Sequence, residues 1–206
     1  MKKLKNQNGR SMIEMLGVLA IIGVLSVGGI AGYSKATMKY RVNKTIEQIT
    51  LIAGNVRTFF ANQRNYDGVN DRNIIKKAKL VPDEMIEYCT TGGSNECPKV
   101  GDIHGISNEF GPVSLTSAGK SSSSGKDAFS ISFSGMPAEA CIEICSHDWR
   151  DVNLGAMEIY IGGGQVSVKK IPMDVDAAVN FCLDREPITL YFDIDVNSTY
   201  WSSKFN

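Results

Sequence analysis

Cysteine, histidine and aspartate lie close together near residue 145, where two kinds of chemistry can be considered. Cys145 with His147 and Asp148 could form a nucleophile with a general base, and Cys141, Cys145 and His147 could hold zinc. His147, two residues after Cys145, would lie on another face of a helix, and no second ligand pair follows at finger-like spacing. We therefore expect no enzyme, no metal site and no cofactor.

The position of the cysteines along the chain favours disulfide bonds instead. Cys89, Cys97, Cys141, Cys145 and Cys182 all follow an uncharged segment, residues 15–32. Such a distribution suits an oxidising compartment outside the cytoplasm, and the odd count leaves one thiol over.

The uncharged segment differs in composition from the rest of the chain. Its 18 residues would form a helix of ~27 Å, close to the ~30 Å of a hydrocarbon core, so it could span a membrane. The 206 residues as a whole carry no net charge, and 43% are hydrophobic. These values indicate one globular domain with an apolar helix attached, and the lack of a basic stripe argues against a nucleic-acid partner.

Glu14 is a single carboxylate at the start of this segment, where a charge near the bilayer centre would cost ~2.5–3.5 kcal/mol or more. The first 32 residues have three interpretations. They could be a signal peptide cut near residues 29–31, a plain membrane anchor, or a segment in which Glu14 pairs with a partner.

A lysine-rich leader ends at Gly9, Glu14 is the fifth residue after this glycine, and an apolar segment follows. This arrangement resembles the type IV prepilin signature. The resemblance implies that a membrane-embedded aspartyl peptidase cuts between Gly9 and Arg10. It also implies N-methylation of Arg10, although the family usually has an apolar residue there, and pairing of Glu14 with the new amine of a neighbouring subunit.

This resemblance implies a structural subunit of a type IV pilus. Its partners would be identical or homologous pilin subunits, the prepilin peptidase, and the pilus assembly platform in the inner membrane. Before assembly the chain would cross the inner membrane once with its head in the periplasm, and afterwards it would be part of an extracellular pilus. The alternatives are a type II secretion pseudopilin, which shares the signature, and a signal-anchored or secreted periplasmic domain.

A long helix is expected to connect the signature to a head. Apolar residues from Val42 to Phe60 recur at spacings of three and four, which predicts an amphipathic helix to about Asn62. The expected organisation is a leader, 1–9, a spine helix, 10–64, with a membrane or filament core at 13–32, and a head, 65–206. Gly28 and Gly29 are the expected weak point of the helix in a filament.

The head is expected to be α+β, with the long N-terminal helix packed on an antiparallel β-sheet. Helices are predicted at 71–79, 137–145 and 174–183. Strands are predicted at 112–116, 128–133 and 188–194, and a hairpin at 156–161 and 165–171 around a triple-glycine turn.

The cysteines of the last third resemble the cysteine-bounded C-terminal region of type IVb pilins. By that resemblance Cys141 pairs with Cys182, and by proximity Cys89 pairs with Cys97, which leaves Cys145 as the free thiol. Cys145 in place of Cys141 as the partner of Cys182 stays open, because both would lie on one face of a short helix.

Overall fold

A computed structural model of the chain describes residues 8–63, 65–118, 128–149, 154–161, 164–169, 172–182 and 188–194. Its internal contacts divide it into two units, residues 1–40 and 41–206, and each is described by itself. Helix α1, Asn8–Phe60, begins in the first unit and ends in the second. The expected helix end near Asn62 is thus met within two residues. Gly28 and Gly29 are helical, and their expected role in a filament stays a prediction.

Within the second unit α1 contributes one buried stripe to the core. Ile49, Ile52 and Val56 are fully buried, and Phe60 is nearly so, whereas Phe59 beside it is largely exposed. This three-and-four spacing places the apolar side chains on one helix face. Each large apolar side chain buried in this way contributes roughly 1.5–3 kcal/mol, so the stripe is the main attachment of the helix.

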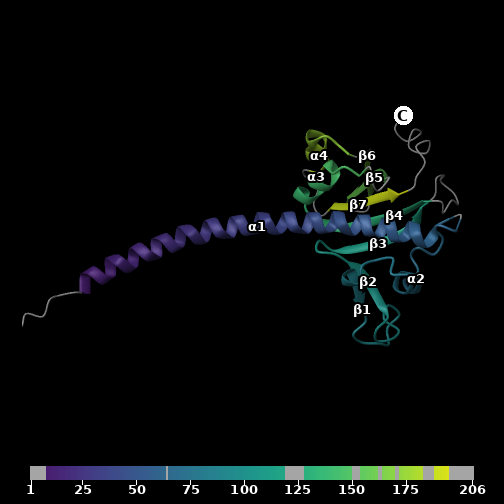
Figure 1. Cartoon of the computed structure of the whole chain (residues 1–206), viewed down its shortest axis with the longest axis horizontal. Coiled ribbons are helices and arrows are strands. Elements are labelled where there is room, and N and C mark those ends of the chain that lie inside the picture. Colours follow the sequence, from purple (N-terminus) through teal and green to yellow (C-terminus); the bar gives the residue numbers. More distant parts are fainter. Residues whose placement is uncertain are drawn as a thin grey trace, which may run out of the picture. The chain divides into compact units, whose positions relative to one another are not determined.

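One antiparallel sheet of seven strands forms the body of the head (Figure 1). Its strand order is β1-β2-β3-β4-β7-β5-β6, and every neighbouring pair is antiparallel. The strands are β1, Ile86–Tyr88, β2, Ile103–Ser107, β3, Pro112–Ala118, β4, Ala128–Met136, β5, Leu154–Ile161, β6, Gly164–Lys169, and β7, Ile188–Ile194. The expected α+β fold, a long helix on an antiparallel sheet, is confirmed.

Strand β4 lies at the centre of the sheet and is buried along most of its length. Phe129 contacts Tyr66, which in turn contacts Phe60 at the end of α1, so this face of β4 is directed towards the helix. On the opposite face the hydroxyls of Ser130 and Ser132 bond to Thr116 and Ser114, which lie directly across on β3. These cross-strand pairs satisfy polar groups that β4 would otherwise bury alone.

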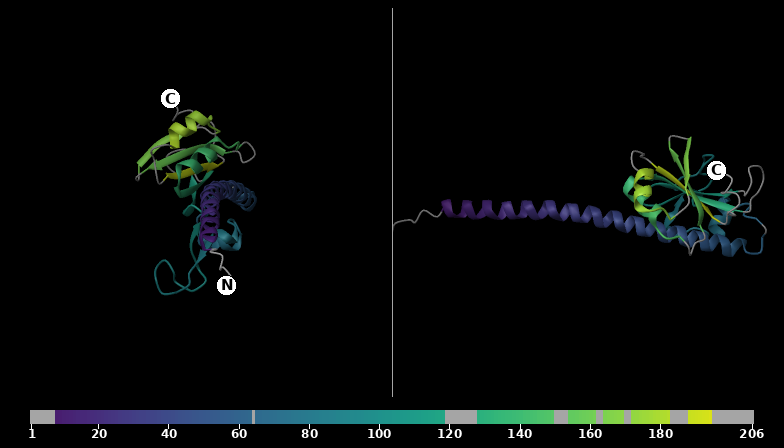
Figure 2. Two further views of the ribbon diagram at one scale, coloured as in Figure 1. Left: turned by 90° about the vertical axis from the view of Figure 1, so that its left-hand side faces the viewer. Right: turned by 90° about the horizontal axis from the view of Figure 1, so that it is seen from above.

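Short helices complete the head. Helix α2, Arg72–Lys77, begins after Asp71, whose carboxylate accepts from the backbone N–H groups of Asn73 and Ile74. A 3-10 turn, η1, spans Asp83–Met85. Helices α3, Ala138–Ser146, and α4, Val175–Cys182, lie side by side at one end of the sheet (Figure 2).

The sequence patterns located most of these elements. Strand β7 has the predicted bounds, and β5 and β6 form the expected hairpin, although its glycines 162–163 and the polar loop 119–125 lie outside the described residues. Strands β1 and β2 and the 3-10 turn were not predicted. They are short, and β1 and β2 carry only one deeply buried end residue each, so no alternating pattern marks them.

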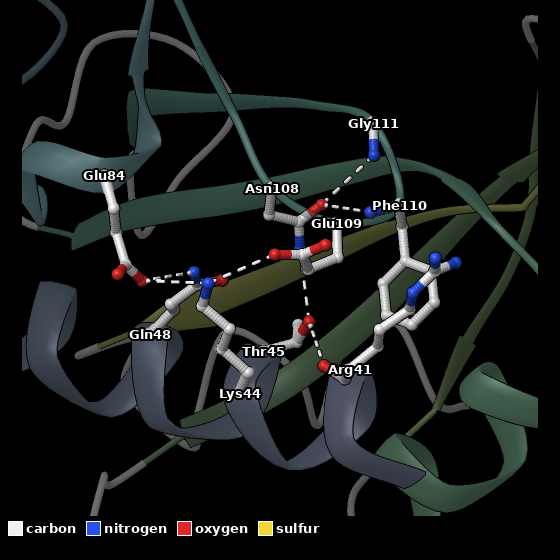
Figure 3. A network of polar contacts seen from close by, with 9 residues as sticks. All are labelled: Arg41, Lys44, Thr45, Gln48, Glu84, Asn108, Glu109, Phe110 and Gly111. Atoms are coloured by element: carbon white, nitrogen blue, oxygen red, sulfur yellow. Dashed lines mark hydrogen bonds and ion pairs between the residues drawn. The ribbon is translucent and has the colours of Figure 1, made fainter. Parts of the chain in front are cut away.

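A group of polar residues orients α1 against the loops of the head (Figure 3). We call this group the α1 clamp; it consists of Lys44, Thr45, Gln48, Glu84, Asn108 and Glu109. The Lys44 ammonium lies 3.1 Å from Glu109 and 3.5 Å from Glu84. Its hydrogen bond to Glu109 raises the pKa of Lys44 above its ordinary value, and the negative charge of Glu84 adds to this.

Asn108 is the residue of the clamp that joins turn and helix. Its Oδ1 accepts from the backbone N–H groups of Phe110 and Gly111, while its Nδ2 donates to Thr45 on α1. Thr45 is fully buried and donates to the Arg41 carbonyl. Ion pairs as exposed as those of Lys44 contribute little, so the clamp mainly fixes the register of the helix on the sheet.

The turn that carries Asn108 packs backbone to backbone against β4. A Cβ at Gly135 would lie 2.8 Å from the Phe110 carbonyl oxygen, and one at Gly111 would lie 2.7 Å from the Ser134 oxygen. Gly135 also has a φ of +81°, a conformation that side chains rarely adopt. Glycine is therefore required at 135 for two independent reasons.

We predict that Gly135→Ala destabilises the head more than Gly93→Ala does. Gly93 also has a positive φ, +107°, but no atom lies near its would-be Cβ. Gly93→Ala should lower the free energy of unfolding by roughly 1–2 kcal/mol from backbone strain. Gly135→Ala should lower it by roughly 3–5 kcal/mol, because a steric clash is added. Urea denaturation of the full chain in mild detergent measures both, and equal losses would refute the packing argument.

Candidate functional site

The residues of the N-terminal signature all lie in α1. Gly9 and Arg10 are in its first turn, and Glu14 follows one turn after Arg10. The Glu14 side chain is exposed, and it has no ion-pair partner among the residues that the structure describes. The helix therefore presents one free carboxylate at the edge of an apolar surface.

The apolar surface next to Glu14 is not covered by the chain itself. Every large apolar side chain from Met12 to Ile30 is 52–76% exposed. Within the described part of the chain, α1 is the one helix long and apolar enough to cross a membrane. Such a surface requires lipid or other apolar helices around it, because water contact costs roughly 25 cal/mol for each Å².

Glycines interrupt this surface at intervals. Gly17, Gly23, Gly28, Gly29 and Gly32 have no atom within 4 Å of a would-be Cβ, so nothing in this chain requires their small size. Small residues allow neighbouring helices to approach closely in an apolar environment. The glycines therefore suit contacts with helices from other chains.

A disulfide ties α3 to α4 at one end of the sheet. It joins Cys141 to Cys182, with the Cα atoms 5.9 Å apart, and both residues are fully buried. Trp149 lies buried beside α3 and donates from Nε1 to the Ile144 carbonyl at 2.9 Å. The bridge thus forms part of a second core, which holds the two helices together.

Cys145 is the free cysteine, and it lies against this bridge. Its Sγ is 3.7 Å from the Sγ of Cys141 and 3.7 Å from that of Cys182. Burial raises the pKa of the Cys145 thiol to about 12, so the thiol is protonated at neutral pH. Cys141 and Cys145 thus lie on one face of α3, as their spacing led us to expect.

The second bridge closes a surface loop. It joins Cys89 to Cys97, with the Cα atoms 5.5 Å apart, where the Gly93 N–H donates to the Cys97 carbonyl. The Nδ1 atom of His104 lies 3.6 Å from the Cys97 Sγ. A loop of about nine residues that is closed in this way loses roughly 2.6 kcal/mol of unfolded-state entropy in the chain-entropy model.

The catalytic and zinc groupings considered from the sequence do not form around His147. Its ring packs edge-on against Trp149, with ring centroids 4.8 Å apart. In the described ranges, two groups bring metal-ligand atoms together: Cys89, Cys97 and His104, and Cys141, Cys145 and Cys182. Each contains a disulfide, so two of its three donors are already bonded to one another.

The α1 clamp is a part of the functional architecture that sequence analysis missed. Lys44 and Asn108 are 64 positions apart, and charged or amide residues on a helix surface usually indicate solvent exposure. The one sequence feature that could have indicated the clamp is Gln48, a polar residue within the apolar stripe. Gln48 is buried, and its amide donates a hydrogen bond to Glu84.

Comparison with known proteins supports the fold and identifies the family. No curated protein matches the chain. Among solved structures, the crystal structure of a type IV b pilin from Salmonella typhi is similar, with 14% sequence identity and a TM-score of 0.52. The match covers 73% of this chain and 97% of that one, and at this identity it shows a shared fold.

A family model gives the more specific result. The model named PilS, described as "PilS N terminal", matches residues 39–194, which is more than half of the chain. This match covers the buried half of α1 and the strands of the sheet as far as β7. Pilins are structural proteins and not enzymes. The chain therefore belongs to the PilS family of type IV pilins, and it has the fold of a type IVb pilin.

Proposed function

We propose that the chain is made as a precursor in the inner membrane, is cleaved after Gly9, and polymerises into a pilus through α1. The observation that carries this proposal is the exposed, uncharged surface of α1, with Glu14 as the carboxylate at its start. Before assembly lipid covers this surface, and in the filament α1 helices of neighbouring subunits cover it. The head stays in the periplasm until assembly moves it to the cell exterior.

Cleavage would supply the partner that Glu14 lacks. Removal of residues 1–9 creates an amine at Arg10, and the peptidase then methylates it in this proposal. The Glu14 of one subunit would pair with the Arg10 amine of its neighbour. A carboxylate and an ammonium ~4 Å apart attract by roughly 4 kcal/mol at an effective dielectric of ~20, before desolvation. Apolar contacts alone leave helices free to slide, so this pair would fix their register.

We predict that the mature chain begins at Arg10. N-terminal sequencing or intact-mass measurement of the protein from cells that contain its peptidase should show loss of residues 1–9, with or without one methyl group. The Gly9→Leu variant should keep its leader, because the bulkier side chain does not fit a cut that depends on glycine. A mature chain that begins near Gly32 would indicate a signal peptidase, and an intact Met1 would indicate a simple anchor.

We predict that Glu14→Gln is inserted and cleaved normally but assembles at least roughly tenfold less filament, because its neutral amide loses ~1.4 kcal/mol or more of charge attraction. Sheared filament yield, compared with total cleaved protein on immunoblots, measures the effect.

Glu47→Gln is the matched control for this experiment. Glu47 is an exposed carboxylate on the same helix, outside the apolar surface, and its side chain makes no hydrogen bond or ion pair with the residues that the structure describes. It should leave filament yield unchanged. Wild-type yield from Glu14→Gln would contradict the proposed pairing, and loss of cleavage would assign Glu14 to the peptidase step instead.

A further inference from the structure

Three sulfur atoms meet between α3 and α4, although a disulfide needs only two. Cys141 and Cys145 lie one helical turn apart on α3 and face Cys182 on α4. All three residues are 0% exposed. The Cys145 Sγ lies 3.7 Å from each sulfur of the bridge, so a third sulfur sits directly beside the bond.

We propose that the tie between α3 and α4 is degenerate: Cys182 can be bonded to Cys141 or to Cys145, and the two forms interconvert by exchange within the head. In the exchange the Cys145 thiol loses its proton, and its sulfur attacks the Cys182 sulfur. The Cys145–Cys182 bond forms as the Cys141–Cys182 bond breaks, and the departing Cys141 sulfur takes up a proton. The number of disulfides is unchanged, so no oxidant or reductant is needed.

The local structure supports this exchange once the cysteine side chains rotate, which brings the Cys145 sulfur into line with the bond that breaks. Cys141 and Cys145 lie on the same face of α3, so either can reach α4 from consecutive turns of one helix. The Cα atoms of Cys141 and Cys182 are 5.9 Å apart, within the usual disulfide range. The Met173 N–H donates to the Cys145 carbonyl at 3.0 Å, so the segment that leads into α4 is held beside Cys145.

Burial sets the speed of the exchange. Only the thiolate is nucleophilic, and burial keeps Cys145 protonated at neutral pH. The exchange is therefore slow in the folded protein near pH 7. Its rate should rise about tenfold for each pH unit below the thiol pKa, because the thiolate fraction does so.

The first experiment replaces each α3 cysteine in the full chain, produced under oxidising conditions and kept in mild detergent. Cys141→Ala should contain Cys145–Cys182 and no free thiol, as shown by thiol titration in denaturant and by non-reducing peptide mapping. Cys145→Ala should contain Cys141–Cys182, also with no free thiol. Two free thiols in Cys141→Ala, at positions 145 and 182, would overturn the proposal.

Thermal melting distinguishes stabilisation by the disulfide from stabilisation by the packing of the cysteine side chains. The two single variants should have similar melting temperatures, because each keeps one disulfide between α3 and α4. The double variant Cys141→Ala/Cys145→Ala has no bridge and should melt roughly 5–15 °C lower than either. A Cys141→Ala variant that melts as low as the double variant would also refute the degenerate tie.

The second experiment uses the wild-type chain, so it does not depend on how variants fold. The protein is held at pH 7 or pH 10 while circular dichroism confirms the fold, then quenched in acid, denatured and alkylated. The label should be on Cys145 at first and should appear on Cys141 with time, faster at pH 10. A label that stays on Cys145 alone at both pH values would show that exchange does not occur. Neither experiment involves cleavage or assembly, so they test the head independently of the proposed function.

Discussion

An apolar helical surface that its own chain does not cover is the constraint on which the rest of this molecule depends. The side chains from Met12 to Ile30 are mostly exposed, and they can be stable only in lipid or against other helices. The same helix then continues as the buried stripe of the head. One element therefore serves two environments: the uncharged segment, residues 15–32, lies in the first unit, and the one-sided apolar stripe from Val42 lies in the second.

Much of this arrangement could be predicted because it depends on residues that are close to one another in the sequence. The uncharged segment, the spacing of Gly9 and Glu14, and the three-and-four repeat from Val42 to Phe60 each involve neighbours in sequence. Strand β7 and the β5–β6 hairpin were equally predictable, because Pro187 precedes the apolar run of β7 and a run of glycines separates those of β5 and β6. Such patterns specify an element and its apolar face, and here they include the exposed apolar surface of α1.

The remaining features depend on residues that are distant in sequence. The α1 clamp joins Lys44 and Thr45 to a turn whose position is set by the close approach of Gly135 to the Phe110 carbonyl. No spacing rule reports such a contact. The cysteine cluster is a second example of a feature that local patterns do not show. Helix geometry places Cys141 and Cys145 on one face of α3, but only the packed structure shows that both sulfurs lie near Cys182 on α4.

The path of α1 also determines how the head would respond to mechanical load. No non-helical residue separates the apolar segment from the buried stripe, so tension applied to the N-terminal part would pass directly into the interior of the head. There the load would be shared by the row of buried apolar side chains from Val42 to Phe60, because all of them belong to the same helix. The bridges at Cys89–Cys97 and Cys141–Cys182 do not involve α1, so they would brace the surrounding body while the buried stripe bears the force.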